Sequence, residues 1–136
     1  MRWPAHIVLA SGVFDILHAG HVSHLRQARD MGDKLVVALT GDQHVNKGPG
    51  RPINDWYSRA NVLRELRCVD DVVWTENSVG SILLLKPTIF VKGIDYAAGD
   101  RWTEDVEAAC RKVGAKIAFT TTPKMSATEI IRKAMA

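Results

Sequence analysis

The stretch from residue 7 to residue 21 restricts the fold of this chain more than any other. Its sequence, IVLASGVFDILHAGH, joins four apolar residues to a turn-forming run and then to the beginning of a helical pattern. This order predicts a strand, a turn and the start of a helix. Gly12 and Gly20 lack a Cβ, so the backbone can approach a ligand closely, and a helix N-terminus attracts anions. The stretch is therefore typical of a phosphate-binding site.

Two histidines stand at the start of the predicted helix. His18 and His21 are three residues apart, so they share one helix face and can direct two imidazole donors to the same anion. A lone His18 would more simply be a helix cap or a core histidine. The pair within this longer phrase favours an anion site.

Length and charge limit the classes of protein that fit. The chain has 136 residues, and we expect residues 1–136 to form a single domain that buries roughly two thirds of its unfolded surface. The formal net charge of +3 is mild and scattered, so we expect no nucleic-acid partner. No apolar run approaches the roughly 18 residues of a membrane span.

We expect the protein to be cytoplasmic. Residues 1–6 lead directly into the first strand and lack the apolar core of a secretory signal. The two cysteines, Cys68 and Cys110, have no metal-ligand spacing and are most simply reduced thiols.

Strand and helix patterns alternate along the whole chain. The predicted strands cover residues 7–10, 34–40, 71–74, 88–92 and 115–120. The predicted helices cover residues 19–31, 55–67, 79–85, 103–113 and 126–135. This alternation predicts an α/β fold, a Rossmann-like doubly wound parallel sheet of five strands with helices on both faces.

The helix patterns also predict caps and buried faces. We expect Asn54 to cap the helix over residues 55–67. We expect the first two helices to bury Val22, Leu25, Ala28, Val62, Leu63 and Leu66.

Ligands of such sheets bind outside the carboxyl ends of the strands. The segment after residue 10 and the loops after residues 40, 92 and 120 lie at those ends. We therefore expect the chemistry in these four segments.

Basic residues follow the second strand. Lys47 and Arg51 lie in the loop NKGPGRP, which can fold over a triphosphate so that ammonium and guanidinium groups meet phosphate charge. The alternative for both is a solvated loop with incidental charges. Arg59 follows in the next helix, where the simpler interpretation is a surface arginine.

The phrase GVFD-x-x-HAGH resembles the HxGH signature of nucleotidyltransferases, which move a nucleoside monophosphate from a triphosphate onto a phosphorylated acceptor. These enzymes carry a basic loop and then an arginine at the positions of Lys47 and Arg59. The resemblance covers essentially the whole chain. It implies that the acceptor's own phosphate attacks the α-phosphorus and that pyrophosphate leaves.

A second phrase, VKGIDY at residues 91–96, is similar to the KGGDY phrase of adenylyltransferases that make ADP-activated heptose for lipopolysaccharide synthesis. In that family the region lines the nucleotide and acceptor pocket, which implies roles for Lys92, Gly93 and Asp95. Ile94 replaces the second glycine of the family. A turn-forming role is the alternative for Asp95.

A third phrase, KMSATE at residues 124–129, matches the family's terminal Ser-Thr-Thr phrase at Ser126 and Thr128, with Ala127 departing from it. It is also similar to the KMSKS signature of class I tRNA synthetases, although this chain is far too short for one. Ser126 and Glu129 fit a capping box as well. Both roles are compatible, since a capped helix N-terminus can bind phosphate.

The resemblance implies an adenylyltransferase that uses ATP, Mg²⁺ carried mainly by substrate phosphates, a phosphorylated sugar or polyol as acceptor, and a homodimer. It implies catalytic roles for His18, His21 and Lys47. The nucleotide-binding candidates are Gly12, Val13, Phe14, His18, Gly20, His21, Lys92, Gly93, Asp95, Ser126 and Thr128. The phosphate- or acceptor-binding candidates are Asp15, Lys47, Arg51 and Arg59.

Three alternatives remain at this point. The closest is a CTP-dependent cytidylyltransferase that acts on glycerol 3-phosphate or a similar phosphate, because residues 67–73 are also similar to the linker before the third strand in that family. A nucleotide sensor without turnover is the second. A metal module built on His18, His21 and His24 is the third, but three-residue steps drift around a helix and no Cys or Glu completes the set. We therefore predict no metal site formed by the protein.

Overall fold

Five parallel strands form one sheet in the order β3-β2-β1-β4-β5. The computed structural model describes residues 6–93, 102–121 and 127–136. The strands are β1 (Ile7–Gly12), β2 (Lys34–Thr40), β3 (Asp71–Thr75), β4 (Ile89–Gly93) and β5 (Lys116–Thr120). The predicted fold class is thereby confirmed, and each predicted strand is present with its ends shifted by at most two residues.

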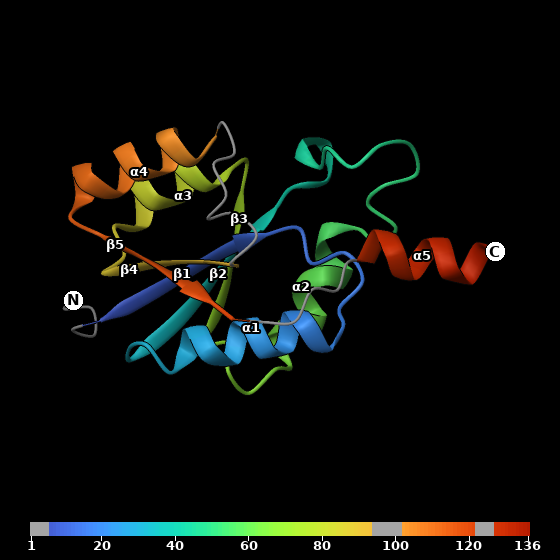
Figure 1. Ribbon diagram of the computed structural model, residues 1–136, viewed down its shortest axis with the longest axis horizontal. Helices are drawn as coiled ribbons and strands as arrows, with labels where there is room; N and C mark the ends of the chain where they lie inside the picture. Colours follow the sequence, from blue (N-terminus) through green and yellow to red (C-terminus); the bar gives the residue numbers. More distant parts are fainter. Residues whose placement is uncertain (1–5, 94–101, 122–126) are drawn as a thin grey trace.

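Helices cover both faces of the sheet, as Figure 1 shows. One face carries α1 (Ala19–Arg29) and α2 (Trp56–Arg64), and the other carries α3 (Ser78–Leu85) and α4 (Trp102–Val113). The last helix, α5 (Ala127–Met135), lies to the right of the sheet in Figure 1. A short 3₁₀ turn, η1 (Asp42–His44), lies inside the predicted loop after β2.

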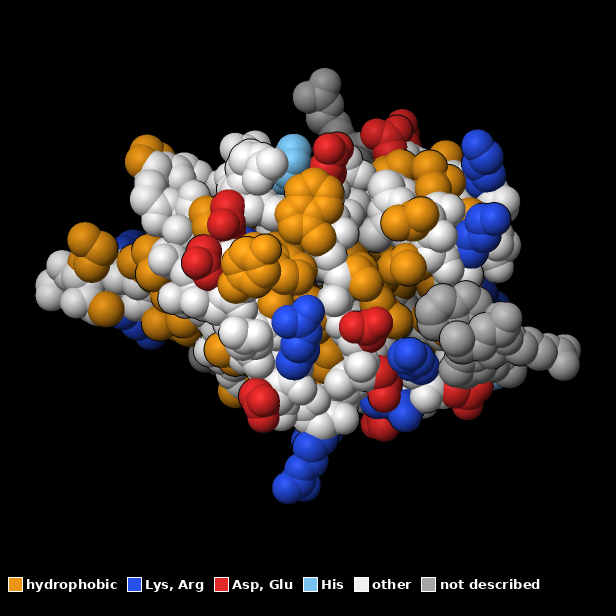
Figure 2. All heavy atoms as spheres, turned by 180° about the vertical axis from the view of Figure 1, so that it is seen from behind, with side chains coloured by type: hydrophobic (Ala, Val, Ile, Leu, Met, Phe, Trp, Pro, Cys, Tyr) orange, Lys and Arg blue, Asp and Glu red, His pale blue; other side chains and the backbone are white. Residues whose placement is uncertain are grey.

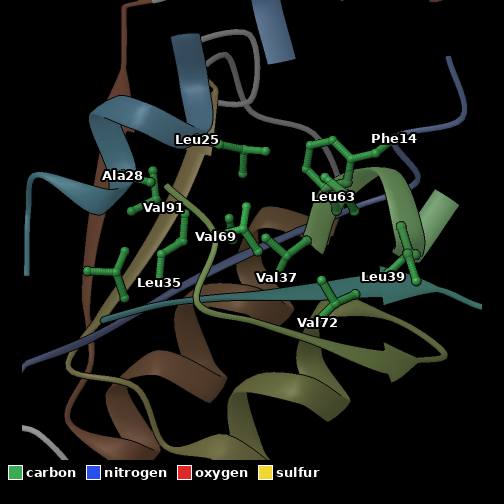
Figure 3. Close-up of a cluster of buried hydrophobic side chains, with 13 residues drawn as sticks. Phe14, Leu25, Ala28, Leu35, Val37, Leu39, Leu63, Val69, Val72 and Val91 are labelled. Atoms are coloured by element: carbon green, nitrogen blue, oxygen red, sulfur yellow. The ribbon is translucent and has the colours of Figure 1, made fainter. Parts of the chain in front are cut away.

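The alternation of side chains along the strands divides the core into two layers. Val8, Val37 and Val91 pack with Leu25 and Leu63 under α1 and α2, in the layer drawn in Figure 3. The neighbouring strand residues face α3 and α4 and form the other layer, whose members include Ile7, Leu9, Val36, Phe90, Ile82 and Val106. Strands buried on both faces explain the near-continuous apolar runs of β1 and β2.

Some local predictions are wrong. Val22 is 36% exposed and Val62 is 50% exposed, because each lies at the edge of its helix's buried face. Asn54 does not cap α2; Asp55 does, through an oxygen that accepts the backbone N–H of Ser58 at 2.8 Å. Asn54 instead donates its side-chain amide to the Asp15 carbonyl.

The order of strands along the sheet reverses direction at the β1–β4 pair. These strands lie side by side, with Val8, Leu9 and Ala10 opposite Ile89, Phe90 and Val91. The carboxyl ends of β1 and β4 therefore form the switch point at which such sheets bind ligands. Within the described part of the chain, every helix is too short or too polar to cross a membrane.

Candidate functional site

The loop after β1 contains a backbone conformation that side chains rarely adopt. Phe14 has φ of 45°, in the left-handed region, and its ring is buried against the core and meets the edge of His21 at 5.3 Å between centroids. A Cβ on Gly12 would lie 2.9 Å from the Phe14 ring, so the ring requires a glycine there. Strain of this kind, held by packing, is typical of functional loops.

His18 and His21 cap the helix that they begin. Nδ1 of His18 accepts the backbone N–H of Gly20 at 3.1 Å, and Nδ1 of His21 accepts the backbone N–H of His18 at 3.3 Å. The two rings stack with their centroids 3.8 Å apart and their planes 26° apart. His18 is therefore a helix cap, as the alternative interpretation had it, but the cap uses only one nitrogen of each ring.

These hydrogen bonds assign the protonation state of both rings. A nitrogen that accepts an N–H carries no proton, so each neutral imidazole has its proton on Nε2. Burial lowers the pKa of His18, and the Lys47 ammonium lowers it further. Burial, with the charges of His18, Lys47 and His24, lowers the pKa of His21 to about 4. Both rings are therefore neutral donors near pH 7.

The helix cap leaves one nitrogen of His18 unused. His18 Nε2 is buried and has no hydrogen-bond partner among the described residues. A buried N–H without a partner is costly, which favours a site whose acceptor is supplied from outside the chain.

The loop after β2 brings Lys47 to the two imidazoles, since its ammonium acts on the pKa of both rings. Burial of this ammonium and the nearby Arg51 guanidinium lower the pKa of Lys47, while Asp15 opposes them. Gly48 and Gly50 next to it have φ of 93° and 76°, which only glycine adopts at low cost. Lys47 thus lies near both histidines, and its catalytic role stays a prediction.

Asp15 ties this loop to the loop after β1. Its carboxylate is completely buried and accepts hydrogen bonds from Arg51 Nε at 2.8 Å, Ile53 N at 2.7 Å and Asn54 N at 2.9 Å. Burial would raise the pKa of Asp15, but these donors outweigh it and lower the pKa. The sequence predicts that Asp15 contacts the acceptor. In the structure its carboxylate oxygens already accept hydrogen bonds from the protein, so Asp15 has an internal role instead.

Arg59 is also an internal residue. Its guanidinium donates to the carbonyls of Asn54, Val13 and Thr40, each at 2.9 Å, and to the Asp42 carboxylate at 2.6 Å. The side chain has no exposed surface. These four hydrogen bonds use four of its five N–H groups. Arg59 is therefore not a surface arginine. The expected contact with a phosphate is not favoured either, because only one N–H group of the guanidinium is left to donate.

Lys92 lies at the carboxyl end of β4 on the α3 side of the sheet. It is 8% exposed, its Nζ is 3.4 Å from Ser78 Oγ, and Ser78 Oγ is 2.9 Å from Ser11 Oγ. Burial lowers the pKa of Lys92 to about 8. Neither serine was among the predicted site residues. Ser11 directly follows the first apolar run, and a polar residue at the carboxyl end of a strand is a signal for a site.

His24 and Thr120 form a further polar pair that the sequence did not indicate. His24 Nδ1 lies 2.6 Å from Thr120 Oγ1, and Thr120 is completely buried. Burial and the Lys92 charge lower the pKa of His24 to about 4. The sequence suggested His24 only as part of a metal module, and the described residues contain no group of three His, Cys, Asp or Glu side chains able to hold a metal.

The remaining candidates are placed as follows. Gly20 is buried in the first turn of α1, Val13 supplies a carbonyl to Arg59, and Gly93 ends β4. Asp95, Ser126 and the side chain of Thr128 lie outside the described residues. The structure thus brings His18, His21 and Lys47 together beside the Asp15–Arg51 pair.

Comparisons with known proteins find similar sequences over most of the chain. The family described as "Cytidylyltransferase-like" matches residues 9–133. The "Bifunctional protein HldE" of Hahella chejuensis is 53% identical over 95 residues, which cover 67% of this chain and 20% of that protein. The protein of the same name from Azorhizobium caulinodans is 45% identical over 107 residues, which cover 76% of this chain and 22% of that protein. The chain thus spans about a fifth of the length of these relatives.

A solved structure resembles the whole fold. The lipopolysaccharide core biosynthesis protein of Thermoplasma volcanium superposes with a TM-score of 0.74 at 30% sequence identity. The match covers 88% of this chain and 98% of that one.

Proposed function

This chain belongs to the cytidylyltransferase-like family, and from that premise we propose that it is an adenylyltransferase. In the proposed reaction AMP passes from ATP to a phosphorylated sugar or polyol, such as heptose 1-phosphate, and pyrophosphate is released. Its similarity to bifunctional HldE proteins and to a lipopolysaccharide core biosynthesis protein supports an acceptor of this kind.

The observation that carries the proposal is the state of the two histidines. His18 and His21 are neutral and stacked, and each has its proton on Nε2, the nitrogen that the helix cap does not use. Two neutral N–H donors and the nearby Lys47 ammonium suit the oxygens of a phosphate group that gains charge during transfer.

The transfer needs no covalent enzyme intermediate. An oxygen of the acceptor phosphate forms a bond to the α-phosphorus of ATP, and the bond from that phosphorus to the bridging oxygen of the β-phosphate breaks. Pyrophosphate leaves with the bonding electron pair. The contribution of the protein is to position both substrates and to stabilise charge on the phosphoryl oxygens, with His18, His21 and Lys47 as the donors.

Among the described residues, the carboxylates beside the histidines and Lys47 already have partners within the protein, which favours Mg²⁺ carried by the substrate. The Asp15 carboxylate already accepts three hydrogen bonds, and Asp42 pairs with Arg59. Mg²⁺ commonly binds through substrate phosphates with few protein carboxylates. We propose that it arrives with the triphosphate, whose charge it partly neutralises.

ATP is the proposed nucleotide because VKGIDY is nearer to the adenylyltransferase form of that loop. CTP with glycerol 3-phosphate is the alternative within the same family, and a sensor without turnover is the alternative of another class. We place the enzyme in the cytoplasm, where nucleoside triphosphates are supplied.

The test is a pyrophosphate-release assay with ATP and with CTP over a panel of sugar and polyol phosphates. The panel should include heptose 1-phosphate and glycerol 3-phosphate. We expect release with ATP and a sugar 1-phosphate. Faster release with CTP would favour the cytidylyltransferase alternative, and binding of ATP without release over the whole panel would favour the sensor.

We also propose that the protein is a homodimer. Figure 2 shows hydrophobic side chains gathered in the middle of the rear face, with charged side chains around them. Val62 on α2, Trp74 on β3 and Leu84 on α3 are 50%, 49% and 80% exposed, and β3 is an edge strand of the sheet. Sedimentation velocity of the wild type tests the dimer, and the same measurement on Leu84→Glu tests whether this exposed leucine contributes to it.

A further inference from the structure

Two polar side chains of α1 contact the end of β5, away from the histidines and Lys47 that the proposed reaction uses. His24 Nδ1 lies 2.6 Å from Thr120 Oγ1. One turn further along α1, Gln27 Oε1 accepts the backbone N–H of Thr121 at 3.1 Å and its hydroxyl at 3.4 Å. Two side chains of one helix thus hold two consecutive residues at the carboxyl end of an edge strand.

The same helix carries the phosphate-site histidines. His18, His21, His24 and Gln27 recur every three residues, and three residues make slightly less than one helical turn. The four side chains therefore occupy neighbouring positions along α1. The first two reach the carboxyl end of β1, and the last two reach the end of β5.

Apolar packing and hydrogen bonds restrain the position of α1 in different ways. Leu25 and Ala28 are completely buried against the sheet, but such contacts are non-directional and tolerate small sliding movements. A short hydrogen bond to a buried hydroxyl is directional, and breaking it would leave the Thr120 hydroxyl without a partner. The His24–Thr120 bond, with the Gln27–Thr121 bonds beside it, therefore adds a directional restraint on the helix.

This bond persists at neutral pH. Burial and the Lys92 ammonium, which lies at the end of β4, lower the pKa of His24 to about 4. The ring stays neutral, so one of its nitrogens remains able to accept the Thr120 hydroxyl proton.

We propose that His24 and Gln27 are positioning residues, which hold α1 against the end of β5 so that His18 and His21 keep the place that phosphoryl transfer requires. The inference rests on the proposed nucleotidyl transfer. Misplacement of reacting groups by about 1 Å can cost on the order of 10²-fold in rate, so a helix shift too small to unfold the protein would be visible in turnover.

The experiment removes the hydrogen bond with shape-conserving changes and compares turnover with stability. The variants are Thr120→Val, His24→Phe and the double variant, assayed with ATP and the acceptor that releases pyrophosphate fastest in the panel above. Thr120→Ser keeps the hydroxyl and serves as the rescue variant, and Arg26→Ala on the exposed side of α1 is the control. Thermal melts set an assay temperature at which every variant is folded.

We expect Thr120→Val and His24→Phe each to lower kcat by about tenfold or more, with a change in KM for ATP of less than about threefold. The double variant should be no slower than the slower single variant, because both remove the same bond. Thr120→Ser and Arg26→Ala should retain wild-type kcat.

Two results would overturn the inference in different ways. A folded Thr120→Val with wild-type kcat and KM would show that the bond is only structural, and the proposed function would stand. A wild type that neither binds ATP or CTP nor releases pyrophosphate with any acceptor would refute the function, and the inference would fail with it.

Discussion

Arg51 Nε lies 2.8 Å from Asp15 Oδ2 in a buried ion pair. The Asp15 side chain is completely buried, and the Arg51 side chain is 7% exposed. The same carboxylate accepts the backbone N–H groups of Ile53 and Asn54. One side chain of the loop after β1 therefore anchors the far end of the loop that carries Lys47. This anchor restrains the loop that brings Lys47 near the histidines.

Asp15→Asn should destabilise the protein and lower its turnover. The amide keeps the size of the side chain but loses the charge and presents two N–H groups toward existing donors. We expect a loss of about 2–3 kcal/mol in the free energy of unfolding. In the folded fraction, turnover should fall by about tenfold because Lys47 loses its anchor. Urea denaturation and pyrophosphate release measure the two effects, with Asp30→Asn on the exposed end of α1 as the control.

Arg59→Lys distinguishes an internal role from a phosphate contact. A lysine has three donors at one point and cannot span the carbonyls of Asn54, Val13 and Thr40, so buried acceptors lose their partners. We expect a loss of about 3 kcal/mol or more in stability, or roughly 10 °C in Tm. A variant with wild-type Tm and a raised KM for the acceptor would instead restore the phosphate role expected from the sequence.

The fold could be predicted because its signals are local. Each signal is visible within a few residues: apolar runs of the length of a strand, and glycines after helices. Together with the alternation of strand and helix along the chain, they specify a doubly wound sheet. That His18, His21 and Lys47 lie near one another could be predicted for a similar reason, since each follows the carboxyl end of a recognisable strand, while their catalytic roles stay a proposal. Topology then brings such ends together.

The roles of the buried polar residues could not be predicted in this way. Arg59 and Asp15 satisfy backbone groups from loops far away in the sequence, and residue type alone does not reveal whether a charged side chain faces a ligand or the interior. The same holds for His24, whose partner Thr120 is 96 residues away. Such pairings depend on the tertiary fold.

Acid should destabilise the protein through His21 and His24. Unfolded imidazoles titrate near pH 6.5, whereas the pKa of each of these residues in the folded protein is lowered to about 4. Between these values the unfolded chain binds more protons than the folded protein. The contribution of the two histidines to the free energy of unfolding is therefore complete above about pH 6.5 and is lost as the pH drops toward about 4. Urea denaturation across this range should show the decrease. His24→Gln should make it shallower, and an unchanged slope would contradict the assignment.

Alkali should weaken nucleotide binding through Lys92. Burial lowers the pKa of this ammonium to about 8, so the free protein loses the charge above that pH rather than near the usual lysine value. If Lys92 contacts the triphosphate, calorimetry should show ATP affinity falling between about pH 7 and pH 9. Lys92→Met should bind ATP weakly already at neutral pH, without the further decrease. The same decrease in Lys92→Met would assign the titration to another group.

His18→Asn separates the two roles of His18, the cap and the donor. Asparagine is a good N-cap, so its side-chain oxygen can replace Nδ1 as the acceptor for the Gly20 N–H, and stability should change by less than about 0.5 kcal/mol. The shorter side chain cannot replace Nε2, which is buried and has no partner among the described residues. We therefore expect kcat to fall on the order of 10²–10³-fold with little change in ATP affinity, because the lost interaction strengthens only in the transition state. His18→Ala should lose the same activity and about 1 kcal/mol of stability as well. A stable His18→Asn variant with wild-type kcat would show that His18 serves only as a cap, and an equal loss in ATP affinity and in kcat/KM would show that it binds the ground state.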